Sequence, residues 1–496
     1  MTSREGFVWT KKDGSKYGIP SIGVINPQQH GVQDSPNSKF DVIVIGAGYT
    51  GLVAARDLVT QGMKTLLIEG RDRIGGRTWH STIDGFNYEM GGTWIHWQMP
   101  HIYREVSLYG LHDDWIVTQT EGGPLDFCTL TTRFSKRNLS HEQESEMFSR
   151  VWRAFCNVDG TYMKEGMPYP FDSMRNRAEL NKYDKLSCKD RMDQIRPHFS
   201  DEEIGMLEAI LLQMGGGPLE EMGLLDALRW WSLGNWTGTG LNDIALRTRL
   251  KSGQSTLARK IFDHAVSTGN LSYLFSTPVA KIEDHDTHSK ITTSTGSTYK
   301  ANRVVCTIPL NVLRDIEFLP RLPPLVQQAI DAGQTNKCNK IHVDIKGPEL
   351  VSWSSFGSPG KGLICALSDN LTPANDTHLV AFGPSADSPA GIKLENNIDG
   401  IKEAIEYLLP DRREITRVVY HDWYHDKFSK GTWCYLPPSW ASKYLDVMQK
   451  PQGNIVLASA DWSDGWRGWI DGGAQQGMQA AKYVIDSLTS RFKSRI

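Results

Sequence analysis

Residues 41–51 read Asp-Val-Ile-Val-Ile-Gly-Ala-Gly-Tyr-Thr-Gly, and no other stretch says more about the fold. Four of the first five residues are apolar and β-branched, and such a run predicts a buried strand. Gly46, Gly48 and Gly51 follow at G-x-G-x-x-G spacing, and residues 52–61 have helical character. The first glycine permits a tight turn, the second lets the backbone approach a pyrophosphate, and the third lets helix and strand pack closely. The pattern therefore predicts a phosphate-binding turn at a helix N-terminus.

A second strand and an acid complete this unit. Residues 64–68 are expected to form the strand, and Glu69 follows directly, where it can accept hydrogen bonds from an adenosine ribose. A glycine-rich turn by itself also occurs without any ligand. Strand, glycines, helix, strand and terminal acid within about 30 residues favour a dinucleotide-binding unit over that alternative.

The sequence after Glu69 indicates which dinucleotide is bound. Residues 69–77 read Glu-Gly-Arg-Asp-Arg-Ile-Gly-Gly-Arg, and Gly91-Gly92-Thr93-Trp94 comes shortly afterwards. An NAD enzyme would normally continue into a plain crossover helix, whereas this chain has a second glycine pair between Arg73 and Arg77. These motifs resemble the flavin-containing amine oxidase family, and within it the monoamine oxidases, the fungal ones above all. A basic surface loop is the alternative interpretation of the two arginines.

A second signature lies near the C-terminus. Residues 454–461 form a predicted strand that ends at Asp461, and a helix is expected over 474–488. The resemblance implies that this element closes over the flavin, with Asp461 bonded to the ribitol and the backbone N–H at Ile470 facing the pyrimidine end of the ring. A backbone N–H and a helix dipole stabilise the negative charge of a reduced flavin. A capping or surface acid is the alternative for Asp461.

The resemblance implies FAD as the cofactor and carries its binding over to residues of both signatures. Residues 279–282 resemble the family strand whose backbone holds the adenine. The cofactor-binding candidates are Gly46, Gly48, Thr50, Gly51, Glu69, Arg71, Gly76, Arg77, Gly92, Thr93, Trp94, Val279, Asp461 and Ile470. No metal site is expected, because no metal-ligand spacing of histidines stands out.

Two tryptophans are the candidates for the substrate site. In monoamine oxidases two aromatic side chains stand roughly parallel in front of the flavin and enclose the amine, and the resemblance places Trp433 and Trp469 there. Such a slot orients the amine, excludes water and favours the neutral amine, whose lone pair assists loss of the α-hydrogen. The chain has 16 tryptophans, and a place in the hydrophobic core is the alternative for each of the two.

A threonine and a lysine complete the expected site. Thr432 stands where animal monoamine oxidases carry the cysteine that is linked to the flavin, so non-covalent FAD is expected; a displaced linkage to Cys434 is the alternative. Lys340 matches the family lysine that reaches flavin N5 through a water, where a cation stabilises charge developing on O₂. Lys337 is close enough to be the counterpart instead. The remaining interpretation places both lysines on a solvated loop.

The expected reaction converts a primary monoamine to an imine and then an aldehyde, while O₂ is reduced to H₂O₂. Amino-acid oxidase and polyamine oxidase are the rivals within the same fold; the first needs an arginine for the carboxylate and the second an acidic tunnel, and the sequence places neither. A flavin-binding protein without turnover is the rival from another class. The candidates for the cavity mouth are Ile210, Gln213 and Trp231. The number of subunits is open, with a homo-oligomer among the options.

Composition narrows the partners and the compartment. A chain of 496 residues predicts two or three domains, and a net charge of −3 gives no reason to expect nucleic acid or an anionic membrane as partner. Seven scattered cysteines without a C-x-x-C pair suit a reducing compartment. No apolar run reaches about 18 residues, so no membrane anchor is expected.

The last three residues are Ser494-Arg495-Ile496. They resemble the C-terminal serine–basic–aliphatic tripeptide that the peroxisomal import receptor reads, of which S-K-L is the reference form. Isoleucine in the last place departs from that form. A peroxisomal protein is therefore expected, and a cytoplasmic protein with an arbitrary basic tail is the alternative.

The predicted fold class is mixed α/β: a Rossmann-like FAD-binding domain interleaved with a substrate domain of mixed sheet and helices. Each domain is expected to use separate stretches of the chain. The predicted division is an N-terminal arm over 1–39, an FAD-binding domain over 40–115, 254–330 and 424–496, and a substrate domain over 116–253 and 331–423.

Overall fold

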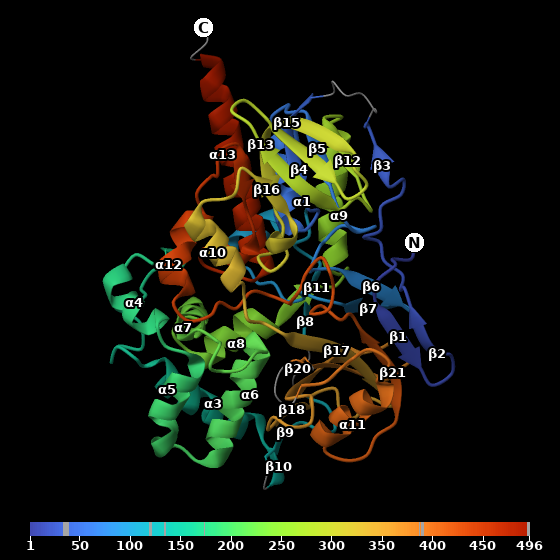
Figure 1. Cartoon of the computed structure of the whole chain (residues 1–496). Coiled ribbons are helices and arrows are strands. Elements are labelled where there is room, and N and C mark those ends of the chain that lie inside the picture. The colour runs from blue at the N-terminus through green and yellow to red at the C-terminus, as the bar shows by residue number, and fades with distance from the viewer. Residues whose placement is uncertain are drawn as a thin grey trace.

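Two large sheets form the framework of the protein (Figure 1). The computed structural model describes residues 1–32, 39–118, 122–132, 135–172, 174–385, 387 and 391–493, the last three without their side chains. Within these ranges each large sheet has nine strands, and the helices cover the sheets or gather beside them. The mixed α/β class predicted from the sequence is confirmed.

The first sheet is built around the strand predicted at 41–45. β4 (Lys39–Ile45) lies between two parallel neighbours, β5 (Thr65–Ile68) and β15 (Thr298–Cys306). The carboxyl ends of these parallel strands meet at one edge, which is where ligands bind in open α/β sheets. The sheet is completed by β3 (Gln29–His30), β12 (Leu271–Leu274), β13 (Val279–Asp284), β14 (Ser289–Thr293), β16 (Glu317–Leu319) and β22 (Ile455–Leu457).

Three helices pack beside this sheet. α1 (Tyr49–Thr60) follows β4, and both α9 (Gln254–Ser267) and the long C-terminal α13 (Ile470–Lys493) contact it. A Cβ on Gly51 would lie 1.9 Å from the Gly46 carbonyl oxygen, so a side chain there would force α1 off the strand. Gly46 itself has φ +99°, the left-handed region that favours glycine. This is the tight turn and close packing that the G-x-G-x-x-G spacing predicts.

The second sheet has β17 (Cys338–Ile345) near its middle, and this strand is buried along its whole length. α11 (Ile398–Leu408) packs on one face, where Ile341, Val343 and Ile345 join its apolar side chains. The hairpin of β6 (His80–Ile83) and β7 (Phe86–Glu89) lies near the opposite face (Figure 1). The other strands are β1 (Phe7–Thr10), β2 (Gly14–Tyr17), β9 (Cys128–Thr131), β10 (Lys136–Leu139), β18 (Ser354–Gly357), β19 (Cys365–Leu371), β20 (Thr377–Pro384) and β21 (Ile415–Tyr420).

A group of helices lies beside the second sheet (Figure 1). Its members are α3 (His141–Cys156), α4 (Arg177–Asp184), α5 (Cys188–Ile195), α6 (Asp201–Gly215), α7 (Leu224–Leu233) and α8 (Gly238–Leu246). The remaining elements include α2 (Pro100–Leu108), α10 (Pro324–Ala332), α12 (Trp440–Met448), and the paired short strands β8 (Trp115–Val117) and β11 (Thr248–Leu250).

The N-terminal segment joins both sheets. β1 pairs with β21 of the second sheet, and β3 pairs with β12 of the first. Residues 1–39, expected as a separate extended arm, thus contribute strands to each sheet. The segment tethers the two halves of the molecule, and the discontinuous domain boundaries drawn from the sequence stay a prediction.

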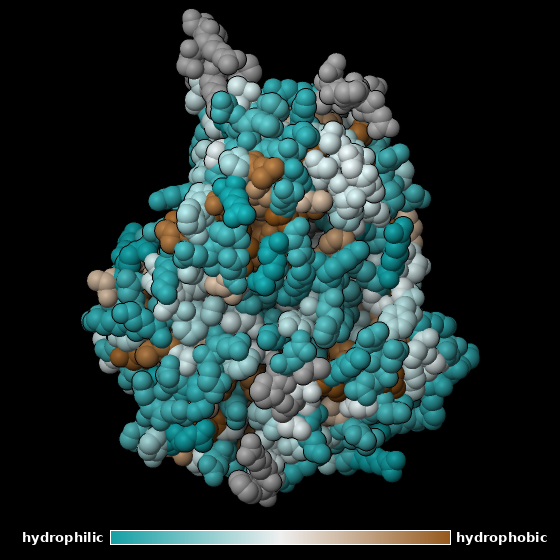
Figure 2. All heavy atoms as spheres, viewed as in Figure 1, coloured by the Kyte–Doolittle hydropathy of each residue, from teal (hydrophilic) through white to brown (hydrophobic). Residues whose placement is uncertain are grey.

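The visible surface is largely polar (Figure 2), and the cysteines lie in the interior. Hydrophilic residues cover most of the face in Figure 2. All seven cysteines are free and buried. Across the described ranges, none of the helices combines the length and apolar character that a membrane crossing requires. The C-terminal tripeptide 494–496 lies outside the described residues.

Candidate active site

A continuous cavity of about 1150 Å³ is lined by residues of both sheets and of the helical group. The predicted site residues that line it are Gly46, Gly48, Thr50, Glu69, Arg71, Gly76, Arg77, Gly92, Thr93, Trp94, Val279, Lys340, Trp433, Trp469 and Ile470. Gly51 and Asp461 lie behind this lining. One cavity therefore brings together residues that are more than 400 positions apart in the chain.

The first end of the cavity is the strand–turn–helix unit. α1 begins at Tyr49, so the N–H groups of its first turn have no helical partner and are available to an anion. Glu69 accepts hydrogen bonds from the backbone N–H of Ala47 at 2.6 Å and of Arg71 at 2.8 Å. Burial raises the pKa of Glu69, and these two hydrogen bonds oppose that rise. The carboxylate is thus held beside the glycine turn, where a ribose hydroxyl can reach it.

The second glycine pair folds against the first turn. The backbone N–H of Gly75 donates to the Ala47 carbonyl at 2.8 Å. A Cβ on Gly76 would lie 3.0 Å from the Cα of Gly48, so the two loops meet backbone to backbone. The loop that follows Glu69 therefore extends the phosphate-binding turn and is no separate surface loop.

Arg77 and Asp461 form a buried ion pair at the cavity wall. Arg77 Nη2 lies 2.6 Å from Asp461 Oδ1, and Nη1 donates to the Thr432 carbonyl at 2.7 Å. The second oxygen of Asp461 accepts the backbone N–H of Leu310 at 2.9 Å. Asp461 thus orients Arg77, and Arg77 lines the cavity. Direct contact between Asp461 and a ribitol stays a prediction.

Lys340 reaches the cavity from β17. Its Nζ donates to the carbonyls of Glu89 at 2.7 Å and Gly91 at 2.9 Å, and to the hydroxyl of Thr93. Three acceptors match the three N–H bonds of an ammonium group. Burial lowers the pKa of Lys340, while the Glu89 carboxylate favours the charged form. Lys340 is therefore a buried, fully bonded amine on a strand.

Lys337, the alternative to Lys340, occupies a different place. Its Nζ lies 5.7 Å from the ring centroid of Tyr424, and the residue is not among those that line the cavity. Lys340 also lies 5.2 Å above the ring of Trp94. Position relative to the cavity thus favours Lys340 as the counterpart of the family lysine.

The two candidate cage tryptophans line the same cavity as Lys340. Trp433 donates its Nε1–H to the Met214 carbonyl at 2.6 Å and packs edge-to-face on Phe382, with ring centroids 6.1 Å apart. Trp469 packs edge-to-face on Trp230 at 5.1 Å. These contacts hold both rings against other aromatic side chains, so their orientation is defined before any ligand binds.

The comparisons with known proteins agree with this geometry. The profile of the family described as flavin-containing amine oxidoreductase matches residues 49–485. The chain belongs to this family. It is 32% identical to pseudooxynicotine dehydrogenase of a Pseudomonas species over 92% of this chain and 88% of that protein. It is 26% identical to nicotine dehydrogenase of Pseudomonas putida, over 91% and 89%.

A solved structure agrees in fold. Cyclohexylamine oxidase from Brevibacterium oxydans superposes with a TM-score of 0.75 over 91% of this chain and 100% of that chain, at 19% identity. Membership of the family and the identity to its named relatives show that the chain is a flavin-dependent enzyme that oxidises amines, as the sequence predicted. Closeness to the fungal members in particular is not part of these findings.

The cavity suits the flavin dinucleotide that this family uses. The glycine turn leaves room for a pyrophosphate, because the nearest atom to a Cβ on Gly48 would be 3.8 Å away. Glu69 lines the cavity beside the glycine turn, and the N-terminus of α13 at Ile470 lines another part of the same cavity. A dinucleotide thus finds an anion site at one end and a second helix N-terminus at the other.

Thr432 and Cys434 are the two residues that bear on covalent attachment of the flavin. Thr432 lines the cavity and donates its hydroxyl to Asn336 Oδ1 at 2.7 Å. Cys434 is buried outside the lining, with its Sγ 3.4 Å from the Asp461 carbonyl oxygen that accepts its hydrogen bond. Burial raises the pKa of Cys434 well above its usual value, which disfavours the reactive thiolate.

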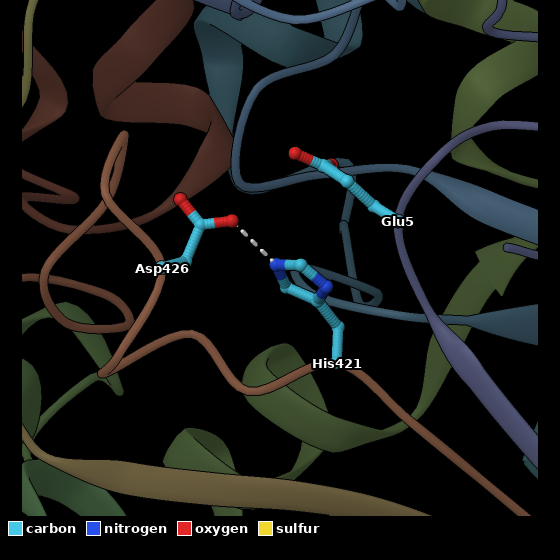
Figure 3. A group of neighbouring side chains, drawn as sticks. All are labelled: Glu5, His421 and Asp426. Atoms are coloured by element: carbon cyan, nitrogen blue, oxygen red, sulfur yellow. Dashed lines mark hydrogen bonds and ion pairs between the residues drawn. The ribbon is translucent and has the colours of Figure 1, made fainter. Parts of the chain in front are cut away.

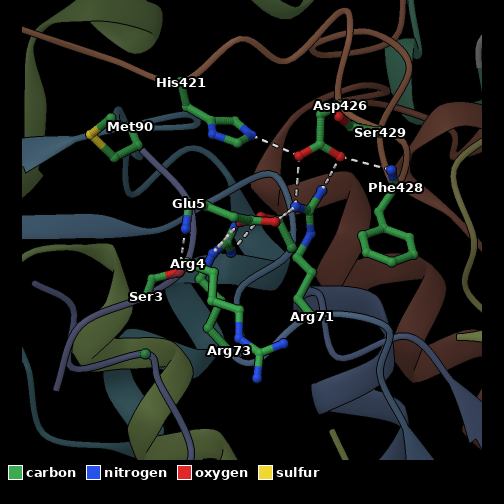
Figure 4. Close-up of polar contacts among 12 residues, drawn as sticks. Ser3, Arg4, Glu5, Arg71, Arg73, Met90, His421, Asp426, Phe428 and Ser429 are labelled. Atoms are coloured by element: carbon green, nitrogen blue, oxygen red, sulfur yellow. Dashed lines mark hydrogen bonds and ion pairs between the residues drawn. The ribbon is translucent and has the colours of Figure 1, made fainter. Parts of the chain in front are cut away.

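Arg71 belongs to a buried charge cluster that the sequence did not reveal (Figure 4). Its guanidinium bonds Asp426 through two hydrogen bonds of 2.8 Å and also contacts Glu5. Arg73 donates to Glu5 at 2.6 and 2.9 Å. Burial alone would raise the pKa of Glu5, but Arg73 and Arg71 hold it below its usual value. Both arginines are therefore neutralised by acids from other parts of the chain.

Glu5, His421 and Asp426 have the arrangement of a possible metal triad (Figure 3). His421 Nε2 lies 2.8 Å from Asp426 Oδ2. The same carboxylates already bind the two arginines, and a cation placed among them would face two guanidinium charges. The triad is thus part of an ion-pair cluster that anchors the N-terminal segment to the loop that follows Glu69.

The far end of the cavity has a mixed lining. Of the three residues expected at the cavity mouth, Ile210 and Gln213 line the cavity, whereas Trp231 does not and its indole donates to the Tyr162 carbonyl at 2.9 Å. Trp230 lines the cavity instead. His141 and Glu144 also line this end, and their side chains are 3.0 Å apart. Hydrogen bonding to Glu144 raises the pKa of His141 to about 9. A helix start at Ser140, which forms a capping box, was the only sequence signal for this pair.

Glu69→Gln tests the ribose end of the site. The substitution keeps the shape but removes a charged acceptor, which is worth roughly 1.5–3 kcal/mol. FAD affinity, measured by fluorescence titration of the apoprotein, should fall roughly tenfold or more. Asp41→Asn, at a half-buried position near the start of the neighbouring strand β4, is the control and should bind FAD as the parent does. Equal affinity of Glu69→Gln and the parent would show that the acid has no role in cofactor binding.

Proposed function

We propose that this amine oxidoreductase acts on primary monoamines, holds FAD non-covalently and uses O₂ as the electron acceptor. One observation carries the proposal: Trp433, Trp469 and Lys340 line the same cavity as the dinucleotide cradle. When bound, the flavin supplies the two-electron oxidation of the amine to the imine, which water hydrolyses to the aldehyde.

The chain's own residues orient the substrate and exclude water from it. The Trp433 and Trp469 rings form apolar walls, against which a neutral amine is favoured over an ammonium ion because a buried charge without a partner is costly. Phe382 and Trp230 back these rings and limit their motion. A substrate held in one orientation gains much of the rate available from proximity.

Lys340 is proposed to serve the second half-reaction. Its ammonium group, fixed by Glu89, Gly91 and Thr93, places a positive charge at the cavity wall. A fixed cation stabilises negative charge that develops on O₂ as it accepts electrons. The two relatives are named dehydrogenases, so reoxidation by O₂ is measured separately from flavin reduction by the amine.

A second candidate substrate class follows from the relatives. Pseudooxynicotine and nicotine appear in the names of the two proteins at 32% and 26% identity. The cavity offers several aromatic side chains that can stack on a heteroaromatic ring: Phe148, Trp230, Phe356, Phe382, Trp433 and Trp469. An amine attached to such a ring is therefore the alternative to a simple aliphatic or benzylic amine.

The remaining proposals concern location and assembly. The tripeptide 494–496 is proposed to address the protein to the peroxisome through its import receptor, which suits an enzyme that forms H₂O₂. A homo-oligomer is the proposed assembly, and the division into an FAD-binding and a substrate domain keeps the boundaries given above.

Non-covalent binding predicts that the flavin can be removed intact. Thr432 cannot form a thioether, and Cys434 lies behind the cavity lining. Acid or heat treatment of the purified yellow protein should release FAD into the supernatant, identified by its mass. Flavin that stays with the precipitated polypeptide would contradict the proposal, and Cys434→Ser would then show whether that thiol carries it.

An amine panel with peroxide detection tests the substrate class. Small aliphatic and benzylic monoamines should be oxidised, with rates that rise as pH approaches the substrate's own pKa because the reactive form is neutral. Their amino-acid analogues should fail, since a buried carboxylate without a partner costs several kcal/mol. Oxidation of an L-amino acid with monoamines ignored would overturn the class, and turnover of pyridine-containing amines alone would select the second candidate.

Trp469→Ala tests the cage. The variant should keep FAD but reduce the rate of anaerobic flavin reduction by roughly 10- to 100-fold, because the amine loses its orientation. Stopped-flow absorbance of the flavin provides the rate. The exposed Trp97 gives a matched control, Trp97→Ala, which should reduce at the parent rate. Equal rates in both variants would remove Trp469 from the substrate site.

Lys340→Met separates the two half-reactions. Reoxidation by O₂ should slow by roughly 100-fold, while anaerobic reduction by amine changes little. In the parent enzyme the rate of reoxidation should fall as pH rises through the lowered pKa of Lys340, because the charged form of the lysine is lost. This decrease should be absent from the pH profile of the variant. Lys337→Met is the control. An effect of Lys337→Met in place of Lys340→Met would transfer the role to that lysine.

A further inference from the structure

One face of β17 carries polar side chains that are fully buried. Lys340, His342 and Asp344 alternate with Ile341, Val343 and Ile345, so the polar set shares one face. This face is covered by the β6–β7 hairpin: Tyr88 packs edge-to-face on His342, with ring centroids 5.8 Å apart. A buried polar row of this kind has a cost unless each group is bonded.

These side chains form a continuous hydrogen-bonded relay. The members of the relay are His342, His378, Asp344 and Tyr88. His342 Nε2–H donates to the Glu89 carbonyl at 2.8 Å, the same oxygen that Lys340 Nζ bonds. His342 Nδ1 lies 2.9 Å from His378 Nε2.

The relay continues across the sheet. His378 Nδ1 lies 2.8 Å from Asp344 Oδ1, and the two residues are direct cross-strand partners of β17 and β20. Tyr88 donates its hydroxyl to Asp344 Oδ2 at 2.5 Å. Arg417 donates to the Tyr88 oxygen at 2.9 Å and pairs with Asp84 at the surface. The relay thus runs from the cavity wall at Lys340 to solvent at Asp84.

Counting protons along the relay fixes its direction. A carbonyl oxygen only accepts, so His342 must carry a proton on Nε2, and in the neutral ring its Nδ1 accepts from His378. At the other end, Arg417 donates to Tyr88, which therefore directs its own proton to Asp344. A proton must also lie between His378 Nδ1 and Asp344 Oδ1, because two lone pairs would otherwise face each other.

The charges around the relay decide where that proton resides. Arg417 Nη1 lies 3.5 Å from Asp344 Oδ2, which favours the carboxylate. Lys340 and Arg249 face His342, and the Arg249–Asp369 ion pair and the Glu89 carboxylate complete the surrounding charged groups. Burial and these cations lower the pKa of His342 well below its usual value, so His342 is the neutral member.

We propose that the relay positions Lys340 through the Glu89 carbonyl and that His378 holds the shared proton as an imidazolium ion. Lys340 and His342 donate to one oxygen, so loss of the His342 donor frees that carbonyl to move and Lys340 with it. This inference rests on the role proposed for Lys340 in reoxidation. His342 and His378 are positioning residues, since they act through Lys340.

The protonation pattern is tested first, by a measurement independent of activity. The holoenzyme is labelled with ring-¹⁵N histidine, and His342→Gln and His378→Asn spectra assign the two residues. At pH 7, His342 should appear as the neutral Nε2–H tautomer and His378 with both nitrogens protonated. A neutral His378 at pH 7, or a His342 proton on Nδ1, would overturn the proposal.

The positioning role is tested by a set of three variants. His342→Leu removes the donor and should slow flavin reoxidation roughly tenfold, with anaerobic reduction and FAD retention unchanged. His342→Gln keeps an N–H that can reach the Glu89 carbonyl and should recover most of the rate. Val343→Ala perturbs the opposite face of the same strand and is the control. Equal slowing in all three variants would mean that His342 only stabilises the strand.

The two proposals fail in distinguishable ways. If Lys340→Met slows reoxidation and His342→Leu does not, the positioning proposal is wrong and the role of Lys340 stands. If Lys340→Met has no effect on reoxidation, that role is wrong, and the histidine spectra still decide whether the relay holds its proton as proposed.

Discussion

The cavity exists because several backbone segments approach one another more closely than side chains would permit. Gly51 places α1 against the turn that ends β4, and a Cβ on Gly477 would lie 2.5 Å from the Thr50 carbonyl oxygen, so α13 rests directly on α1. Gly76 brings the second loop onto the first at Gly48. Two helix N-termini therefore converge on one cavity, and their dipoles favour negative charge there.

Burial of charge imposes the second constraint. Arg77, Arg71 and Lys340 each lie at the cavity wall with their polar atoms bonded by carboxylates, carbonyls or a hydroxyl. Removing one partner of such a buried pair typically costs about 3–5 kcal/mol, because the other charge remains without compensation. The acids that accompany these cations are thus as necessary to the site as the cations themselves. They also tie the N-terminal segment, through Glu5, to Arg71 and Arg73 in the loop that follows Glu69.

The low polarity of the cavity also affects the chemistry that its residues can perform. A site enclosed by tryptophans and by buried ion pairs strengthens each remaining electrostatic interaction. One ammonium group, Lys340, can therefore influence the transfer of electrons, provided its position is fixed. Its three acceptors come from β7 and the segment that follows, so the packing of that hairpin on β17 determines where the charge lies. The histidine relay beneath the hairpin extends this control to the surface at Asp84.

The sequence alone predicted the dinucleotide unit, the family and 15 of the residues that line the cavity, because these depend on local spacing: glycines two and three positions apart, an acid at a strand end, and aromatic residues in family motifs. It also led to Lys340 over Lys337, which the cavity lining supports. It did not reveal that Asp461 binds Arg77, that Glu5 and Asp426 neutralise Arg71, or that His342 meets His378. Those pairs join residues between 36 and 384 positions apart. Only sheet register and the docking of the two sheets bring such residues within hydrogen-bond distance, and no local pattern encodes that geometry.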